Sequence, residues 1–188
     1  MLNRRRWLIA SAHGFTGLIV SRYSRVSPLA AAPGGADSTK IVSIVEFSDA
    51  GARRGVAKVP MIVKNEDDWR QQLTPLAFAV TRRGETERPF TGLYWDFRDK
   101  GLYRCVCCAT ALFNSDRKFA SDTGWPSFWA PLAKENVREH ADYRFGMSRI
   151  AVSCRRCDAH LGHVFDDGPD PTGLRYCMNS AAMRFMKA

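Results

Sequence analysis

The stretch Cys154-Arg-Arg-Cys157-Asp-Ala-His160-Leu-Gly-His163 decides the organisation of this chain, because it repeats the spacing of Cys105-Val-Cys-Cys108 after 45 intervening residues. A two-residue spacer lets one tight turn direct two thiolates at a common point, and two such turns complete a tetrahedron. We therefore predict one structural Zn²⁺ per chain, held by Cys105, Cys108, Cys154 and Cys157, with no position left open for catalysis. A redox Cys-x-x-Cys pair and ordinary disulfides are the alternatives.

Two cysteines, Cys107 and Cys177, remain outside this set. Cys107 lies between two predicted ligands, and we interpret it as a small packed residue whose side chain points away from the metal. Cys177 follows a segment that can supply protons and a positive field, which lower the pKa of a thiol. The groups of this segment are His160, His163, Asp166, Asp167 and Arg175. Because a lone cysteine is more often structural than catalytic, the residues alone leave both interpretations of Cys177 open.

Local patterns predict two short helices leading into a β-rich domain over residues 60–188. The pattern turns helical from Asn65, where acidic residues suit the positive end of a helix dipole. Thr74-Pro75 begins a second helix, since Thr can cap and Pro fits the first helical position. Residues 138–145 and 148–153 are rich in strand formers and flank a glycine, so they predict an antiparallel hairpin.

We interpret residues 1–32 as a targeting segment and residues 33–59 as a linker or an edge element. The leader has no acidic residue, begins with three consecutive arginines at residues 4–6 and ends in small residues. These features are typical of a twin-arginine export signal and predict a periplasmic location. A mitochondrial presequence and an untargeted basic tail are the alternatives. In the linker, residues 41–45 form one short β-like run before Gly51 and Gly55 interrupt it.

Composition excludes several classes of protein. The 188 residues are 45% hydrophobic and 25% charged, which is typical of a globular domain. The formal charge is +9, but five of these units belong to residues 1–32, and the remainder is too mild to predict a nucleic-acid partner. The apolar run of the leader covers only 13 positions, so we expect no stable membrane anchor.

Read whole, the motifs resemble the methionine sulfoxide reductase B family, which reduces the R epimer of methionine sulfoxide. The matches include the two cysteine pairs, the stretch Gly124-Trp-Pro-Ser-Phe-Trp129, and Gly173-Leu-Arg-Tyr-Cys177-Met-Asn-Ser. The resemblance extends from about residue 63 to residue 185. It implies a mainly β fold of two antiparallel β-sheets, tent- or barrel-like, with short N-terminal helices and the same zinc ligands. It also implies a peptide-methionine (R)-S-oxide reductase that repairs oxidised proteins.

The resemblance makes Cys177 the nucleophile, which attacks the sulfoxide sulfur and becomes a sulfenic acid. His160 and His163 would handle the sulfoxide oxygen and its protons, with Asp167 orienting them. Arg175 and Asn179 lie two residues on either side of Cys177, so in a strand all three face the same way. Trp125 would contact the substrate methyl group, although a lone Trp is more often a core residue. Phe128 and Trp129 are predicted to be core residues.

The sequence departs from the family at the resolving cysteine, whose usual position is Thr123. We therefore expect an external thiol or a thioredoxin-like donor to reduce the sulfenic acid of Cys177 directly, with Cys107 as the alternative resolving residue. The substrates would be free methionine sulfoxide or proteins and peptides that contain it. Smaller departures are Asp122 and Ala109, where the family usually has glycine. The competing functions are a zinc-stabilised binding module and a thiol peroxidase that uses Cys177.

Overall fold

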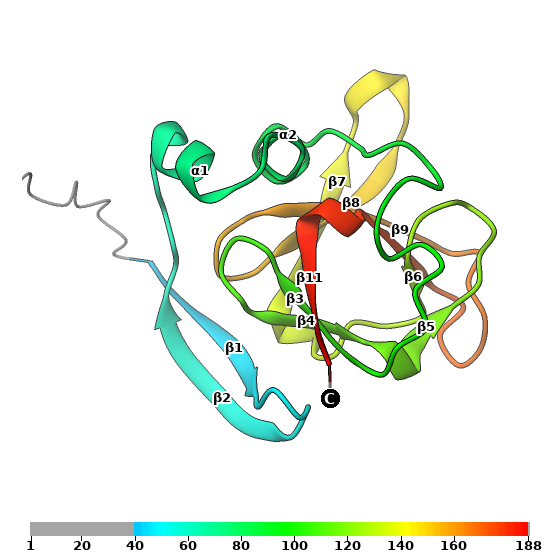
Figure 1. The fold of residues 1–188 in the computed structure, drawn as a ribbon, viewed down its shortest axis with the longest axis horizontal. Helices are drawn as coiled ribbons and strands as arrows, with labels where there is room; N and C mark the ends of the chain where they lie inside the picture. The colour runs from blue at the N-terminus through cyan, green and yellow to red at the C-terminus, as the bar shows by residue number, and fades with distance from the viewer. Residues whose placement is uncertain (1–39, 188) are drawn as a thin grey trace, which may run out of the picture. The chain divides into compact units, whose positions relative to one another are not determined.

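The computed structural model describes residues 40–187, so the targeting segment predicted for residues 1–32 lies outside the described residues. Within the described part the chain is mainly β, with antiparallel strands in three sheets and two α-helices (Figure 1). The mainly β, antiparallel prediction is confirmed. The number of sheets differs from the two that were expected, because an additional two-stranded sheet precedes the helices. No helix of the described residues is long and apolar enough to cross a membrane.

This additional sheet is a hairpin of β1 (Ile41–Phe47) and β2 (Arg53–Pro60), in the segment expected to be a linker or an edge element. The β-like run predicted at residues 41–45 is part of β1, and the segment continues as a paired strand because the two glycines do not end the pairing. Gly51 has φ +83° and lies in the turn, and Gly55 has φ +124° and lies beside a register shift. Val42 and Ile44 are buried on one face of β1, and Val45 is buried on the other.

Two short helices follow the hairpin: α1 (Glu66–Gln72) and α2 (Pro75–Arg83), which lie side by side in Figure 1. The Asn65 side chain accepts a hydrogen bond from the Asp68 backbone N–H, and Thr74 accepts one from Ala77. Both are N-cap contacts, which satisfy backbone donors that the first helical turn leaves free. The helices begin where the sequence pattern places them, but they come after the β1–β2 hairpin in the described chain.

The remaining strands form two antiparallel sheets. A six-stranded sheet has the order β5-β6-β10-β9-β8-β7, and a three-stranded sheet has the order β11-β3-β4. The bounds are β3 Gly101–Cys105, β4 Ala111–Asn114, β5 Lys118–Phe119, β6 Ser127–Phe128, β7 Val137–Asp142, β8 Arg149–Cys154, β9 His160–Phe165, β10 Arg175–Met178 and β11 Met183–Lys187. Four 3₁₀ turns connect them: η1 Ser115–Arg117, η2 Lys134–Asn136, η3 Arg144–Gly146 and η4 Ser180–Ala182.

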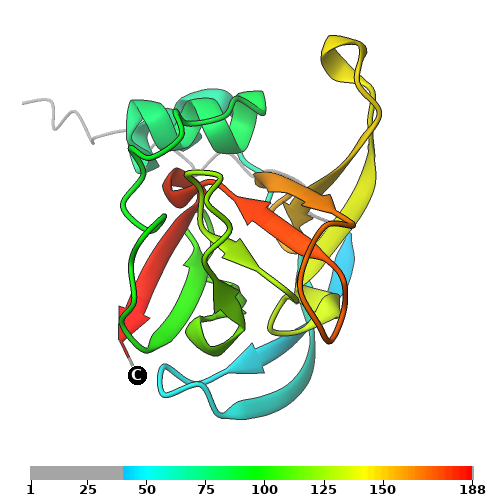
Figure 2. The same cartoon turned by 90° about the vertical axis from the view of Figure 1, so that its right-hand side faces the viewer.

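The β7–β8 hairpin confirms the pairing expected of residues 138–145 with residues 148–153. Arg138 lies opposite Ser153, and Asp142 lies opposite Arg149 at the end of the ladder. The connection contains η3 and Gly146, whose φ of +69° is in the left-handed region that glycine adopts readily. In Figure 2 the end of this hairpin, drawn in yellow, extends away from the sheet.

An aromatic core joins the two larger sheets. Phe128 is fully buried, as predicted, and its ring stacks on Phe113 of β4 with centroids 4.5 Å apart. Tyr103 of β3 meets the Phe128 ring edge-on at 5.0 Å. Trp129, also predicted for the core, is only half-buried, with the Arg117 guanidinium 5.2 Å from its ring. Because β6 pairs with β10, this packing fixes the strand that carries Cys177.

Candidate active site and metal centre

The two Cys-x-x-Cys segments fold into matching turns. The Ala109 N–H donates to the Cys105 carbonyl and the Asp158 N–H to the Cys154 carbonyl, each at 2.9 Å. Ala109 and Asp158 have φ of +63° and +56°, a left-handed conformation that favours glycine. Ala109 was noted in the sequence as a departure from glycine, and its backbone gives the physical reason for that preference.

These turns bring four sulfurs together. Every pair of the four Sγ atoms lies within 4.8 Å, with Cys105 and Cys157 3.6 Å apart and Cys108 and Cys154 3.5 Å apart. A tetrahedral site with metal–sulfur bonds of about 2.3 Å needs sulfurs about 3.8 Å apart. The four cysteines are therefore positioned to bind a metal ion. All six cysteines of the described chain are free thiols, so the disulfide alternative is not realised in this structure.

Cys107 lies in the hydrophobic core, as its interpretation as a packed residue predicted. Its exposed fraction is 6%, and its backbone oxygen accepts a hydrogen bond from the Gln72 side chain of α1. Within the described residues no hydrogen bond joins Cys107 to Cys177. The surroundings of Cys107 are therefore formed by the metal-binding turn and the helices.

Cys177 lies in β10, between Ser127 of β6 and His163 of β9. Its Sγ atom lies 3.9 Å from the Thr123 hydroxyl oxygen, so the residue at the expected resolving position is indeed next to the thiol. The thiol lines a cavity of about 120 Å³. Other residues of its lining are Trp125, Arg149, His163, Phe165 and Asn179.

Gly162 allows β9 and β10 to approach one another beside the cavity. A Cβ atom there would lie 2.1 Å from the Cys177 backbone oxygen and 2.9 Å from the Met178 Cα. Any side chain at this position would therefore push apart the strands that carry His163 and Cys177. This is a physical reason for the glycine in the His-x-Gly-His stretch.

The electrostatics of Cys177 differ from the expectation. Burial raises the pKa of its thiol, while the Arg175 charge and hydrogen bonds from Thr123 and Ser127 act in the opposite direction. The net direction is a raised pKa, whereas the neighbouring charges had predicted a lowered one. The sequence shows those charges, but it does not show that the thiol is withdrawn from water.

Arg175 and Asp167 form a pair that the sequence did not predict. The Arg175 guanidinium donates to both oxygens of the Asp167 carboxylate, at 2.8 and 2.7 Å, and lies 4.4 Å from the Phe165 ring. Asp167, predicted to orient the histidines, makes no hydrogen bond to either of them within the described residues. Asp167 lies just beyond the end of β9, where Arg175 of the neighbouring β10 strand reaches it. It holds the guanidinium beside Cys177 instead.

The carboxylate next to a histidine is Asp142, which was not predicted from the sequence. Its Oδ2 atom lies 2.8 Å from Nε2 of His163, and its side chain is only 5% exposed. A signal was present, because the predicted β7–β8 hairpin places Asp142 at the same sheet end as the cavity. Finding it required the register of three strands, and Asp142 precedes His163 by 21 residues.

His160 does not line the Cys177 cavity, although its ring lies 5.2 Å from that of His163. Its Nε2 atom is buried without a hydrogen-bond partner in the described structure. Burial, followed by the charge of His163, lowers the pKa of His160 to about 4. His160 is therefore neutral at pH 7, and His163 is the histidine that reaches the cavity.

Glu87 holds Trp125 and Asn179 in place, a role that the sequence did not reveal. Its backbone oxygen accepts from the Trp125 indole N–H at 3.0 Å, and its N–H donates to the Asn179 side-chain oxygen at 2.9 Å. The Asn179 amide also donates to the Leu161 carbonyl. Asn179 lines the cavity together with Cys177, and its amide is engaged with the backbone. Trp125 presents its ring to the cavity in an orientation fixed by its N–H.

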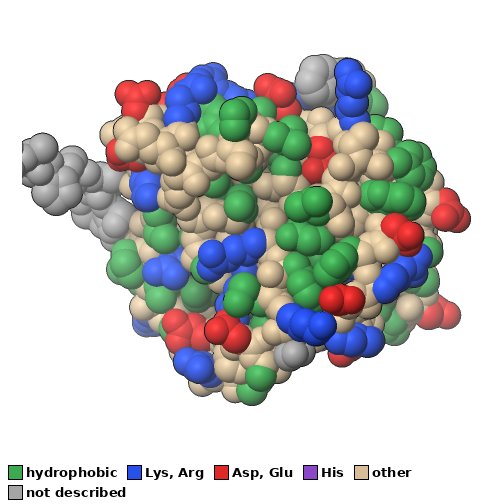
Figure 3. Space-filling view, in the orientation of Figure 1, with side chains coloured by type: hydrophobic (Ala, Val, Ile, Leu, Met, Phe, Trp, Pro, Cys, Tyr) green, Lys and Arg blue, Asp and Glu red, His purple; other side chains and the backbone are tan. Residues whose placement is uncertain are grey.

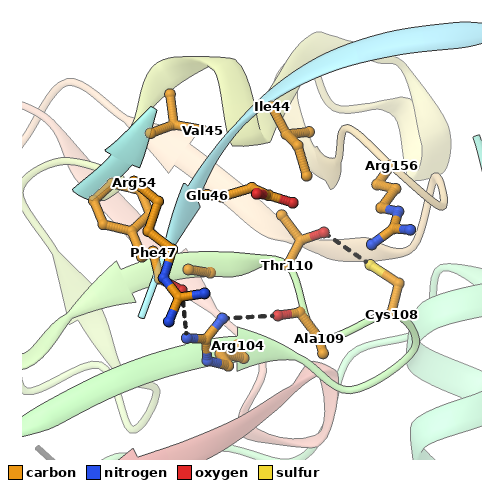
Figure 4. A pocket seen from close by; sticks show the side chains of 11 residues that line it. Ile44, Val45, Glu46, Phe47, Arg54, Arg104, Cys108, Ala109, Thr110 and Arg156 are labelled. Atoms are coloured by element: carbon orange, nitrogen blue, oxygen red, sulfur yellow. Dashed lines mark hydrogen bonds between the residues drawn. The ribbon is translucent and has the colours of Figure 1, made fainter. Parts of the chain in front are cut away.

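A second cavity, of about 230 Å³, lies between β1 and the first metal-binding turn (Figure 4). Arg104 donates to the Ala109 carbonyl there, and the Cys108 sulfur contacts the Thr110 hydroxyl. The only thiol in the lining of this cavity belongs to Cys108, a predicted metal ligand. The cavity at Cys177 is therefore the better candidate for chemistry.

On the face shown in Figure 3, basic and acidic side chains are interspersed.

Comparison with known proteins agrees with this geometry. The SelR domain model matches residues 73–187. Peptide methionine sulfoxide reductase MsrB of Synechococcus sp. (strain RCC307) is 56% identical over 121 residues, covering 64% of this chain and 89% of the relative. Proteins of the same name from Hahella chejuensis and Pseudomonas aeruginosa (strain UCBPP-PA14) are 55% and 54% identical, covering 68% and 66% of this chain and 91% and 95% of the relatives. The chain is therefore an enzyme of the MsrB family of peptide methionine sulfoxide reductases, which carries the SelR domain.

Proposed function

We propose that this enzyme reduces the R epimer of methionine sulfoxide, in oxidised proteins or as the free amino acid, through a sulfenic acid on Cys177. The observation that carries the proposal is the cavity that joins the Cys177 thiol, the Asp142-bonded His163 and the Trp125 ring. These supply a nucleophile, a proton-carrying group and an apolar contact for a methyl group. A zinc-stabilised binding module, the competing function, would not need these three groups in one cavity.

The reaction begins with attack of the Cys177 thiolate on the sulfoxide sulfur. The oxygen is transferred to Cys177, whose sulfur is oxidised to a sulfenic acid, and the substrate sulfur is reduced to the thioether of methionine. The departing oxygen needs a proton, which His163 can hold at the cavity wall. Two reducing thiols then return the sulfenic acid to a thiol, giving a disulfide between them and one water molecule.

The arrangement of Trp125 supports epimer selection. Its indole N–H is engaged by the Glu87 carbonyl, so the ring cannot rotate freely to accommodate a second substrate orientation. A fixed ring against the methyl group, in the same cavity as Cys177 and His163, would orient the sulfoxide oxygen. The S epimer placed with the same methyl contact would direct its oxygen elsewhere.

We also propose that the four-cysteine site holds a structural zinc ion. Four thiolates fill a tetrahedral coordination shell and leave no position for substrate. The ion, when bound, ties the β3–β4 turn to the β8–β9 turn. Metal analysis of the purified protein should give one zinc per chain, and a value near zero for Cys108→Ser would link it to this site.

For the reductant, the proximity of Thr123 to Cys177 supports direct reduction by an external thiol or a thioredoxin-like donor. A hydroxyl cannot form the internal disulfide that a cysteine would form there. Cys107 is buried in the core, which disfavours it as a resolving residue. Intact-mass analysis after one turnover without reductant should show an oxidised Cys177; a Cys107–Cys177 disulfide would contradict direct reduction.

The leader supports a periplasmic location, reached by twin-arginine export. That route carries folded proteins, so metal could be loaded before the thiols meet an oxidising compartment. Fractionation of bacterial cells tests this proposal. We expect processed protein in the periplasm and retention when the arginines at residues 4–6 are changed to lysine. Processed protein in the cytoplasm, unaffected by that change, would count against it.

The activity is tested with dithiothreitol and the separate epimers of N-acetyl-methionine sulfoxide. We expect turnover of the R epimer only, and none in Cys177→Ser. Cys107→Ser is the matched control, since it removes a thiol outside the cavity, and it should retain the activity. No turnover of the R epimer, or undiminished turnover in Cys177→Ser, would refute the proposal. Peroxide consumption without sulfoxide reduction would instead favour the thiol peroxidase.

A further inference from the structure

Asp142, at the end of β7, is held by three neighbours in a buried position beside the Cys177 cavity. Its Oδ2 atom meets Nε2 of His163 at 2.8 Å and Nη2 of Arg149 at 3.2 Å. Its Oδ1 atom accepts from the Arg144 backbone N–H at 3.0 Å and from Arg144 Nε at 3.1 Å. Four donors on two oxygens leave this carboxylate little freedom to move.

The contacts also keep the carboxylate ionised. The hydrogen bond from His163, assisted by the N–H and guanidinium of Arg144, holds the pKa of Asp142 well below its usual range. An ionised carboxylate can only accept hydrogen bonds, so Nε2 of His163 must carry the hydrogen. In the neutral ring this leaves the lone pair on Nδ1. Nδ1 makes no hydrogen bond within the described residues.

We propose that Asp142 is a positioning residue that fixes the His163 ring with hydrogen on Nε2 and stabilises its protonated form, leaving Nδ1 to deliver a proton to the sulfoxide oxygen. This inference rests on the proposed function. In the transfer step the Nδ1–H bond breaks and an O–H bond forms. The oxygen leaves the substrate sulfur for the Cys177 sulfur, and solvent returns the proton to Nδ1 afterwards.

Asp142 and the arginines around His163 act on the pKa of the ring in opposite directions. Burial lowers the pKa of His163, the hydrogen bond to Asp142 raises it, and the Arg149 charge lowers it. The charged and titratable groups that face the ring are Asp142 of β7, Arg144 of η3, Arg149 of β8, His160 of β9 and Cys177 of β10. Asp142 is the only carboxylate of this set. Its removal leaves the Arg149 and Arg144 charges, which disfavour the imidazolium, without the carboxylate that opposes them.

The substitution Asp142→Asn keeps the size of the side chain and removes its charge. We expect kcat for the R epimer to fall about ten- to a hundredfold, with KM changed much less, because the proton step is impaired and binding is not. A lower pKa of His163 leaves less imidazolium at every pH above it, so the loss in kcat/KM should grow from acid towards neutral pH. Asp142→Glu keeps the charge and should recover part of the loss. Asp116→Asn removes an exposed carboxylate paired with Lys100 and is the matched control.

Nitrogen NMR of the histidine rings gives a readout that does not depend on activity. The wild-type His163 ring should show hydrogen on Nε2, and Asp142→Asn should show mixed tautomers and a lower pKa. A wild-type ring with hydrogen on Nδ1 overturns the inference, even if the variant fails to fold. An unchanged kcat in a folded Asp142→Asn protein also overturns it. If the wild type reduces neither epimer but the expected tautomer is present, the proposed function fails while the positioning of His163 stands.

Discussion

Replacing Thr123 with cysteine should give Cys177 an internal resolving partner. The Thr123 hydroxyl oxygen lies 3.9 Å from the Cys177 sulfur. A disulfide needs sulfurs about 2.05 Å apart, so the gap to close is about 1.9 Å. A C–S bond exceeds a C–O bond by about 0.4 Å, which leaves about 1.5 Å. A χ1 rotation within the loop around residues 121–124 can supply this displacement.

The assay is intact-mass spectrometry after one equivalent of the R epimer, without reductant. The wild type should gain one oxygen, about 16 Da, as a sulfenic acid. The Thr123→Cys variant should instead become about 2 Da lighter, because the second thiol displaces water from the sulfenic acid. Its turnover should then depend on a dithiol reductant able to open that disulfide.

Thr123→Ser is the matched control, since it keeps the hydroxyl and adds no thiol. It should behave like the wild type and gain one oxygen. A folded Thr123→Cys protein that also retains the added oxygen would refute the reasoning, because the two side chains would then be too far apart to react. A 2 Da loss in the wild type would equally refute it, since it would require a resolving cysteine elsewhere.

Four further predictions follow from the same structure. Asn136 is fully buried and makes three side-chain hydrogen bonds, two of them to Val45 of β1, so Asn136→Ala should lower the free energy of unfolding by about 3–5 kcal/mol in urea denaturation. With dithiothreitol, the alkaline limb of the kcat/KM profile should report the Cys177 thiol, whose pKa lies above that of His163, and Arg175→Gln, which removes a charge that lowers the pKa of the thiol, should move this limb to higher pH. Ala109→Gly relieves a left-handed backbone and should stabilise the fold by about 0.5–1 kcal/mol in the same denaturation assay. Removing the metal with a chelator should cost of the order of 4 kcal/mol through loss of the cross-link alone, seen as a lower melting temperature by calorimetry.

The sequence predicts features whose cause is local. The two cysteine pairs fix their own turns, and the capping residues Asn65 and Thr74 start the helices at short range. The β7–β8 hairpin is also predictable, because its two runs of strand-forming residues and the glycine between them follow one another directly in the sequence. The β1–β2 hairpin is harder, because Gly51 and Gly55 resemble chain breaks until the bulge and turn that accommodate them are seen.

The electrostatics of the site depend on partners that are distant in sequence. Asp167 is four residues from His163, yet it pairs with Arg175, whereas Asp142 reaches His163 across two strand pairings. Similarly, the sequence places charges around Cys177 but does not show its burial, which decides the direction of its pKa. Distance along the sequence therefore does not predict which carboxylate forms a hydrogen bond with His163.

A single-turnover experiment tests the central claim most directly. The reduced enzyme is mixed with a stoichiometric amount of either epimer of N-acetyl-methionine sulfoxide and quenched with a sulfenic-acid trap. The R epimer should give one N-acetyl-methionine per chain, with the trapped oxidised residue located at Cys177 by peptide mass spectrometry. Product without modification of Cys177, or equal product from the S epimer, would contradict the account.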